Sequence, residues 1–103
     1  MDITPPDAFG RHRDGALLLD VREPFEYHAG HVPDATNIPL GHLSTEHAGL
    51  PRNREILVIC ATGNRSTTAT AALRHLGYDA FNVAGGMAAW QHRGLPVAAS
   101  RAA

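Results

Sequence analysis

The sequence predicts an α/β fold with a mostly parallel sheet, and two observations support that prediction. Short apolar runs alternate with segments of helical spacing, which is typical of strand–helix–strand units. The run Ile56–Cys60 is apolar throughout, as expected of a central strand covered on both faces. A chain of 103 residues fits one domain. We expect its core over residues 16–97, with loosely ordered ends at residues 1–14 and 98–103.

The first half of the chain predicts two strands and two helices. Residues 16–20 are apolar up to a closing aspartate, which indicates a buried strand whose end carries polar side chains. Residues 23–29 predict a short helix, because proline is tolerated in a first helical turn and Gly30 can end it. A short strand is expected around residues 36–38, and a helix near residues 43–48 that a glycine and a proline end.

The second half repeats the alternation after the apolar strand. Residues 66–76 place alanine and leucine side chains on one helical face, and a glycine follows to end the helix. Residues 78–83 predict another strand, and residues 87–92 a short helix behind a Gly-Gly turn. In parallel sheets of this kind ligands bind beyond the carboxyl ends of the strands. The residues that directly follow the predicted strands are therefore the candidates for a functional site.

Composition and charge exclude several classes of function. The chain is 44% hydrophobic and 18% charged, as in ordinary globular proteins. Its formal charge of −1 gives no reason to expect nucleic acid or an anionic membrane as a partner. All nine basic residues are arginine, which excludes a lysine base or Schiff base. No stretch approaches the roughly 18 apolar residues of a membrane span, and residues 1–6 lack the pattern of a signal peptide, so we expect a cytoplasmic location.

Cys60 is the only cysteine, and it stands between the apolar strand and a glycine-containing loop that leads into a helix. The N–H groups of such a turn and of a helix start can stabilise a thiolate. Settings of this kind lower a cysteine pKa from about 8.5 to roughly 3.5–7.5. A lone cysteine after an apolar run can equally be a small buried side chain. The loop of Thr-Gly-Asn-Arg that follows favours a nucleophile, and with a single cysteine any resolving thiol must come from another molecule.

Three segments carry ordered motifs that cover nearly the whole chain. They are Leu19-Asp20-Val21-Arg22 with Glu26, Gly30-His31-Val32-Pro33-Asp34-Ala35 and Asn37-Ile38-Pro39; Cys60-Ala61-Thr62-Gly63-Asn64-Arg65-Ser66; and Gly85-Gly86-Met87-Ala88-Ala89-Trp90 with Gly94-Leu95-Pro96-Val97. Taken together, these segments resemble the signatures of the rhodanese family, sulfurtransferases that carry sulfur as a cysteine persulfide. The resemblance implies a single domain whose central sheet is flanked by helices on both faces.

The resemblance also implies a two-step activity centred on Cys60. The thiolate would take a sulfane sulfur from thiosulfate or a persulfide donor and pass it to cyanide, a thiol or a protein acceptor. No metal or organic cofactor is required, and we expect a monomer or weak dimer. The alternative is a non-catalytic module of the same fold that binds a partner or senses reactive sulfur.

The loop after Cys60 supplies the predicted substrate-binding residues. Its backbone N–H groups can stabilise both the thiolate and a persulfide anion. Gly63 is expected to have a positive φ. Arg65 could fork two hydrogen bonds to an anionic donor, or could be a solvated or salt-bridged arginine. Ala61 stands where many family members carry a long polar or basic residue, which argues against efficient thiosulfate turnover. The predicted set is Ala61, Thr62, Gly63, Asn64, Arg65 and Ser66.

Loop length separates this chain from the cysteine phosphatases. These enzymes place an arginine six positions after the cysteine, where this chain has Ser66. The shorter loop, with Arg65 one position earlier, suits a single sulfur atom better than a tetrahedral phosphate. The sequence therefore favours sulfur transfer over phosphate hydrolysis.

The remaining candidates are assigned supporting or structural roles. Asp20 and Arg22 are expected to orient the neighbouring loop or to pair with Glu26. The seven histidines show no ligand spacing that predicts zinc, and we expect His31 to hydrogen-bond a loop backbone. The aromatic residues Trp90 and Phe81 are expected in the core.

Overall fold

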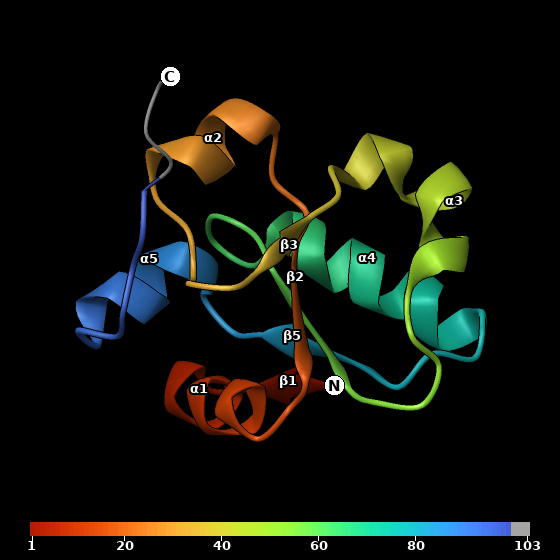
Figure 1. The fold of residues 1–103 in the computed structure, drawn as a ribbon, viewed down its shortest axis with the longest axis horizontal. Coiled ribbons are helices and arrows are strands. Elements are labelled where there is room, and N and C mark those ends of the chain that lie inside the picture. The colour runs from red at the N-terminus through yellow and green to blue at the C-terminus, as the bar shows by residue number, and fades with distance from the viewer. Residues whose placement is uncertain (100–103) are drawn as a thin grey trace.

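A five-stranded sheet forms the centre of the structure, a computed structural model that describes residues 1–99 (Figure 1). The strands are β1 (Asp2–Ile3), β2 (Leu17–Asp20), β3 (Thr36–Asn37), β4 (Ile56–Ile59) and β5 (Ala80–Val83). Their spatial order is β1-β5-β4-β2-β3, and every neighbouring pair is parallel. The predicted α/β class is confirmed, and the most apolar strand, β4, lies in the middle of the sheet as expected.

Helices cover both faces of the sheet, and β4 divides the core between them. The helices are α1 (Pro5–Arg13), α2 (Pro24–Ala29), α3 (Leu43–Glu46), α4 (Asn64–His75) and α5 (Gly86–His92). Helices α3 and α4 lie on one face of the sheet, and α1 and α5 lie on the other (Figure 1). Side chains from alternate positions of β4 pack into the two halves of the core. Trp90 of α5 has the largest of the fully buried side chains. Helix α2 lies beyond the carboxyl end of β2 (Figure 1).

Most predicted boundaries agree with the observed elements to within two residues, and two of the differences have a clear local cause. The helix expected near residues 43–48 is shortened to α3, because the chain tightens into 3₁₀ turns at Leu40–His42 and His47–Gly49. Helix α4 begins at Asn64, two residues earlier than expected, because the preceding loop turns sharply at Gly63. The early start shortens the loop that holds Cys60.

The expectation that residues 1–14 form a loosely ordered end is wrong. Strand β1 pairs with β5, and α1 packs against α5 through contacts that include an edge-to-face pair of Phe9 and Trp90, with ring centroids 6.0 Å apart. Thr4 caps α1 by accepting a hydrogen bond from the Asp7 N–H group at 3.3 Å. The pattern was missed because a two-residue strand is too short to show periodicity, and its pairing partner is far away in sequence.

The carboxyl-terminal end of the described chain also has a partner. His31 and Ala98 exchange two backbone hydrogen bonds of 2.8 Å in an isolated antiparallel bridge. The expectation of a loosely ordered end at residues 98–103 is therefore wrong for residue 98, and residues 100–103 lie outside the described part of the chain. Within residues 1–99, no helix has the length and apolar character needed to cross a membrane.

Candidate active site

Cys60 lies immediately after β4, at the carboxyl edge of the sheet, and is followed closely by α4. Cys60 is only 1% exposed, so the surrounding protein shields almost all of it from solvent. The Gly63 N–H group donates to the Cys60 Sγ atom at 3.1 Å, and the Ser66 Oγ atom lies 3.2 Å from the same sulfur. The loop therefore curls around the sulfur and directs hydrogen-bond donors at it.

These donors determine the ionisation of the thiol. Burial raises the pKa of Cys60, but the Ser66 hydroxyl and the backbone N–H groups of Ser66, Gly63 and Thr62 lower it, so that the pKa lies below its ordinary value. The thiolate is the nucleophilic form of cysteine. The lowered pKa favours the thiolate form, and the fixed dipoles of the loop are placed to stabilise its negative charge.

Gly63 has the positive φ that the sequence predicts. Its φ is 107°, in the left-handed region that glycine adopts more readily than other residues. A Cβ atom at this position would lie 3.4 Å from the Gly85 nitrogen, which is an ordinary van der Waals contact. The backbone conformation is therefore the property that favours glycine in this loop.

The start of α5 holds the opposite side of the same loop. The Met87 N–H group donates to the Cys60 carbonyl at 2.8 Å, and the Ala88 N–H group donates to the Ala61 carbonyl at 3.0 Å. Gly86 has a φ of 59°, and a Cβ atom there would lie 2.7 Å from the Ala61 carbonyl carbon. Since the N–H and C=O groups of a trans peptide point in opposite directions, anchoring these carbonyls on α5 turns the following N–H groups away from it.

Sequence reasoning missed this contribution of α5. The Gly-Gly pair signalled a turn before a helix, but no local pattern reveals which backbone packs against it. The only available signal was the strict need for a residue without a side chain at position 86, which one sequence cannot show.

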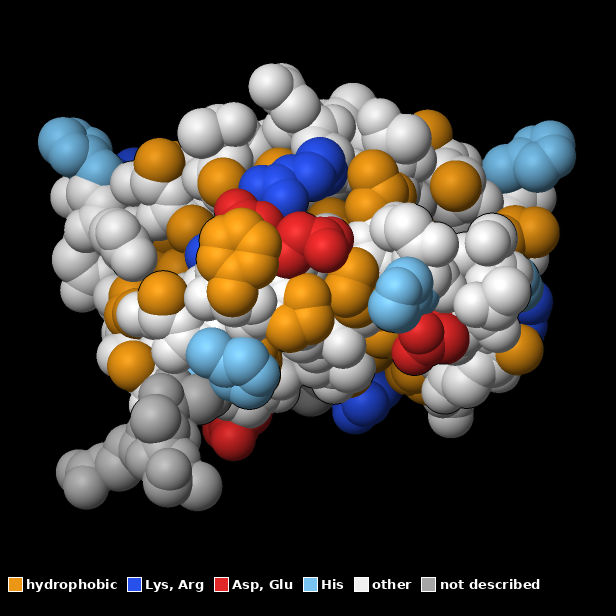
Figure 2. Space-filling model, turned by 90° about the horizontal axis from the view of Figure 1, so that it is seen from above, with side chains coloured by type: hydrophobic (Ala, Val, Ile, Leu, Met, Phe, Trp, Pro, Cys, Tyr) orange, Lys and Arg blue, Asp and Glu red, His pale blue; other side chains and the backbone are white. Residues whose placement is uncertain are grey.

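Arg65 is bound to a carboxylate on α2. Its Nη1 and Nη2 atoms donate to the two carboxylate oxygens of Glu26 at 2.7 and 2.9 Å. The hydrogen bond from Arg65 is the main reason that the pKa of Glu26 falls to about 2. Of the two roles left open for Arg65, the structure shows the salt-bridged arrangement. The site view in Figure 2, which faces the carboxyl end of the sheet, shows basic and acidic side chains in contact near its middle.

Asp20 and Arg22 form a buried ion pair at the end of β2. The Asp20 carboxylate accepts hydrogen bonds from the Arg22 Nε and Nη2 atoms at 3.0 and 2.8 Å. The Nη2 atom also donates to the Gly30 carbonyl at 2.7 Å. Asn37 closes the arrangement by donating to the carbonyl oxygens of both residues at 2.9 Å. Arg22 is thus paired with Asp20 and not with Glu26. Through its hydrogen bond to Gly30, the pair links the segment before α2 to the residue that follows it.

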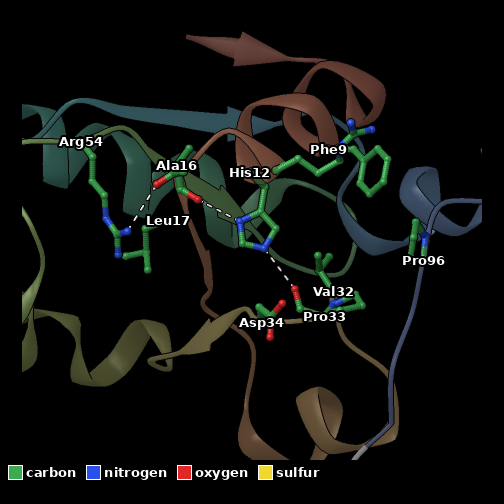
Figure 3. A pocket seen from close by; sticks show the side chains of 11 residues that line it. Phe9, His12, Ala16, Leu17, Val32, Pro33, Asp34, Arg54 and Pro96 are labelled. Carbon is green, nitrogen blue, oxygen red and sulfur yellow. Dashed lines mark hydrogen bonds between the residues drawn. The ribbon is translucent and has the colours of Figure 1, made fainter.

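Two histidines hold backbone segments together. The His31 Nδ1 atom lies 2.7 Å from the Tyr27 carbonyl oxygen, so the predicted backbone partner is confirmed, but it belongs to α2 and not to a loop. The His12 ring lies between two carbonyl oxygens, 2.8 Å from that of Ala16 and 3.1 Å from that of Pro33 (Figure 3). Among residues 1–99, no group of three or more His, Cys, Asp or Glu side chains is arranged to hold a metal ion.

The cavity beside His12 is not part of the Cys60 site. It measures about 480 Å³ and is lined by residues of α1, of the start of β2 and of the loop around Pro33 (Figure 3). No residue of the loop 60–66 lines it. The chemistry-bearing residues are instead gathered at the carboxyl edge of the sheet.

The two aromatic residues predicted in the core differ in burial. Trp90 is completely buried, and its Nε1 atom donates to the Pro96 carbonyl at 2.8 Å. Phe81 lies at the margin of the core, where the guanidinium groups of Arg11 and Arg74 are 5.0 and 5.5 Å from its ring centroid. The prediction is confirmed for Trp90 and only in part for Phe81.

Comparison with known proteins gives consistent matches over most of the chain. The family model for the rhodanese-like domain matches residues 5–93. A sulfurtransferase from Allochromatium vinosum is 36% identical over 87 residues, which make up 84% of this chain and 81% of that protein. The crystal structure of a rhodanese-related protein from Thermoplasma volcanium has a TM-score of 0.90 and 37% identity, covering 94% of this chain and 96% of that one. A rhodanese-like domain protein from Staphylococcus aureus has a TM-score of 0.80 and 31% identity, covering 86% and 89%.

Proposed function

Because the chain belongs to the rhodanese-like domain family, we propose that it is a sulfurtransferase that moves a sulfane sulfur from thiosulfate or a persulfide to a thiophilic acceptor through a persulfide on Cys60. The observation that carries this proposal is the hydrogen-bonding around the Cys60 sulfur. Donors from Gly63 and Ser66 converge on a buried thiol and lower its pKa.

In the first half-reaction the Cys60 thiolate attacks the outer sulfur of the donor. A new S–S bond forms on Cys60, the donor's own bond to that sulfur breaks, and sulfite or a thiolate leaves with the electron pair. The product is the Cys60 persulfide anion. The N–H groups of the loop stabilise negative charge at this place before and after the transfer, so little reorganisation is needed.

In the second half-reaction an acceptor attacks the outer sulfur of the persulfide. The acceptor can be cyanide, a thiol or a protein thiol. The S–S bond on Cys60 breaks, the outer sulfur leaves with the acceptor, and the Cys60 thiolate is regenerated. A separate general base is not required, because the loop keeps the leaving sulfur ionised.

The orientation of Arg65 supports sulfur transfer over phosphate hydrolysis. A phosphatase loop directs its arginine at the bound phosphate, whereas the Arg65 guanidinium is bonded to Glu26 on α2. The donors that do face the sulfur are a hydroxyl and backbone N–H groups. These groups can stabilise the negative charge of a persulfide on Cys60.

Intact-protein mass spectrometry tests the proposal directly. The wild-type protein is incubated with thiosulfate or with cysteine persulfide, measured, and measured again after cyanide. We expect a gain of one sulfur atom from at least one donor and its loss to cyanide, with neither change in Cys60→Ser. A protein that gains sulfur but does not release it to cyanide or to thiols is a sulfur-binding module. Failure of both donors to add sulfur contradicts the proposed function.

A further inference from the structure

The ion pair of Arg65 and Glu26 joins the loop that holds Cys60 to helix α2. Arg65 is the only charged residue of the loop 60–66. The side chains of Arg65 and Glu26 are 36% and 23% exposed, so the pair forms part of the surface around Cys60. The pKa of Arg65 is raised mainly by the hydrogen bond to Glu26. The negative charge of Cys60 also raises it, so the guanidinium and the sulfur interact electrostatically.

Glu26 neutralises this arginine firmly. Both carboxylate oxygens accept from the guanidinium, and Oε1 accepts a further hydrogen bond from the Glu23 N–H group at 3.0 Å. With a pKa of about 2, the carboxylate stays ionised at neutral pH. The positive charge of Arg65 is therefore balanced, and Glu23 on the same helix adds a negative charge. In Figure 2 the basic side chain in the middle of this face is bordered by acidic ones.

No other positively charged side chain among the described residues at the carboxyl edge of the sheet replaces the Arg65 charge that Glu26 neutralises. Among the described residues, the other arginine at the carboxyl ends of β2 and β4 is Arg22, which is buried and bound to Asp20 and to the Gly30 carbonyl. Ala61, directly after the nucleophile, carries no charge or polar side chain. A doubly charged donor approaching the Cys60 thiolate meets no free positive charge here.

The two donor classes differ in how strongly this surface repels them. Thiosulfate carries two negative charges, and after its outer sulfur is transferred the rest of the molecule leaves as the sulfite dianion. A thiol persulfide carries one negative charge and leaves as a thiolate. The Cys60 thiolate and the carboxylates of Glu26 and Glu23 repel a donor more strongly when the donor carries more negative charge. Given the proposed function, on which this inference rests, we propose that Glu26 is a specificity-determining residue that masks Arg65 and selects thiol persulfides over thiosulfate.

The step that follows needs no further reactant. The Cys60 thiolate attacks the outer sulfur of a persulfide R–S–S⁻, the S–S bond of the donor breaks, and the thiolate R–S⁻ leaves with the electron pair. The charge before and after the step is the same. The resulting Cys60 persulfide anion remains in contact with the loop donors.

The experiment removes the negative charge that neutralises Arg65, by replacing Glu26 with glutamine. Rate constants for persulfide formation on Cys60 are measured by quenched-flow mass spectrometry with thiosulfate and with cysteine persulfide, at low and high salt. For Glu26→Gln we expect the thiosulfate rate constant to rise about tenfold at low salt, the lower end of electrostatic steering effects. The constant for cysteine persulfide should change less than twofold, and the thiosulfate gain should shrink at high salt.

Two further variants assign the effect to the pair. Glu23→Gln removes a negative charge from the same helix but leaves the hydrogen bonds between Glu26 and the Arg65 guanidinium in place, so it should raise the thiosulfate rate constant much less than Glu26→Gln does. The double variant Glu26→Gln/Arg65→Ala should lose the thiosulfate gain. An unaltered circular dichroism spectrum and an unaltered rate of Cys60 alkylation by iodoacetamide establish that the fold and the nucleophile are intact.

The outcomes separate this inference from the proposed function. If cysteine persulfide charges Cys60 but Glu26→Gln leaves the thiosulfate rate constant unchanged or lowers it, the masking role is wrong while the sulfurtransferase stands. An equal gain in Glu23→Gln also overturns the role of Glu26, because net charge alone would then explain it. If neither donor charges Cys60 in any variant, the proposed function fails and this inference fails with it.

Discussion

Replacing Gly86 by alanine should both destabilise the protein and deactivate Cys60. A Cβ atom at Gly86 would lie 2.7 Å from both the carbon and the oxygen of the Ala61 carbonyl, and it would also overlap the Cys60 carbonyl oxygen. These neighbours are backbone atoms of the active-site loop, so they cannot turn aside as a flexible side chain would. The loop or the start of α5 must move.

The expected cost follows from the contacts that the movement disturbs. Alanine at a φ of 59° adds a penalty of roughly 1–2 kcal/mol. The hydrogen bonds from Met87 and Ala88 to the loop carbonyls contribute about 0.5–1.5 kcal/mol each. The free energy of unfolding should therefore fall by about 2–5 kcal/mol, a large share of the roughly 5–15 kcal/mol typical of a whole domain.

Gly94 provides a matched control for this substitution. It also has a positive φ, of 70°, but a Cβ atom there would have no neighbour within 4 Å. Gly94→Ala should thus show only the backbone penalty of roughly 1–2 kcal/mol. Urea denaturation measures both variants, and the pH dependence of iodoacetamide alkylation reports the pKa of Cys60.

We expect the alkylation midpoint to move to higher pH in Gly86→Ala and to stay in place in Gly94→Ala. The displaced loop no longer presents its N–H groups to the sulfur, whereas the end of α5 is remote from it. If Gly86→Ala is as stable as Gly94→Ala and keeps the wild-type alkylation profile, the argument that α5 supports the loop is refuted.

Three further substitutions test individual interactions. Ser66→Ala removes a hydroxyl that lowers the Cys60 pKa, so alkylation of Cys60 should shift to higher pH; an unchanged midpoint would mean that backbone N–H groups alone control it. The ordinary pKa of a glutamate carboxyl is 4.5, and in the folded protein the pKa of Glu26 falls to about 2. The ionised carboxylate therefore stabilises the fold above pH 4.5, and this contribution disappears as the pH falls toward 2. The stability difference between wild type and Glu26→Gln in urea should accordingly be smaller at pH 3 than at pH 7, and a constant difference would contradict an ion-pair origin. Asp20→Asn leaves the Arg22 guanidinium buried without its charged partner and should cost about 3–5 kcal/mol in the same assay, whereas a loss near zero would show that solvent reaches the pair.

Local patterns in the sequence were sufficient to predict most of the sheet and the position of the candidate nucleophile at the end of a strand. The apolar run ending at Cys60 and the helical spacing of residues 66–76 concern neighbours in the chain, and the observed β4 and α4 follow them closely. The positive φ of Gly63 could also be predicted, because a tight turn between a strand and a helix restricts the backbone within a few residues. These features depend on short-range sterics and periodic burial, which a single sequence displays.

The partners of the active-site loop were decided only by the tertiary structure. Glu26 and Arg65 are 39 positions apart, and nothing in either segment shows that α2 brings a carboxylate to the loop. Gly86 contacts the loop after Cys60, and β1 pairs with β5. Each of these contacts joins segments that only the folded sheet brings together. The sequence by itself therefore determined the candidate nucleophile, Cys60, and the strand that precedes it. The folded chain determined which charges and which helix surround that residue, because these contacts are long-range and leave no periodic pattern in the sequence.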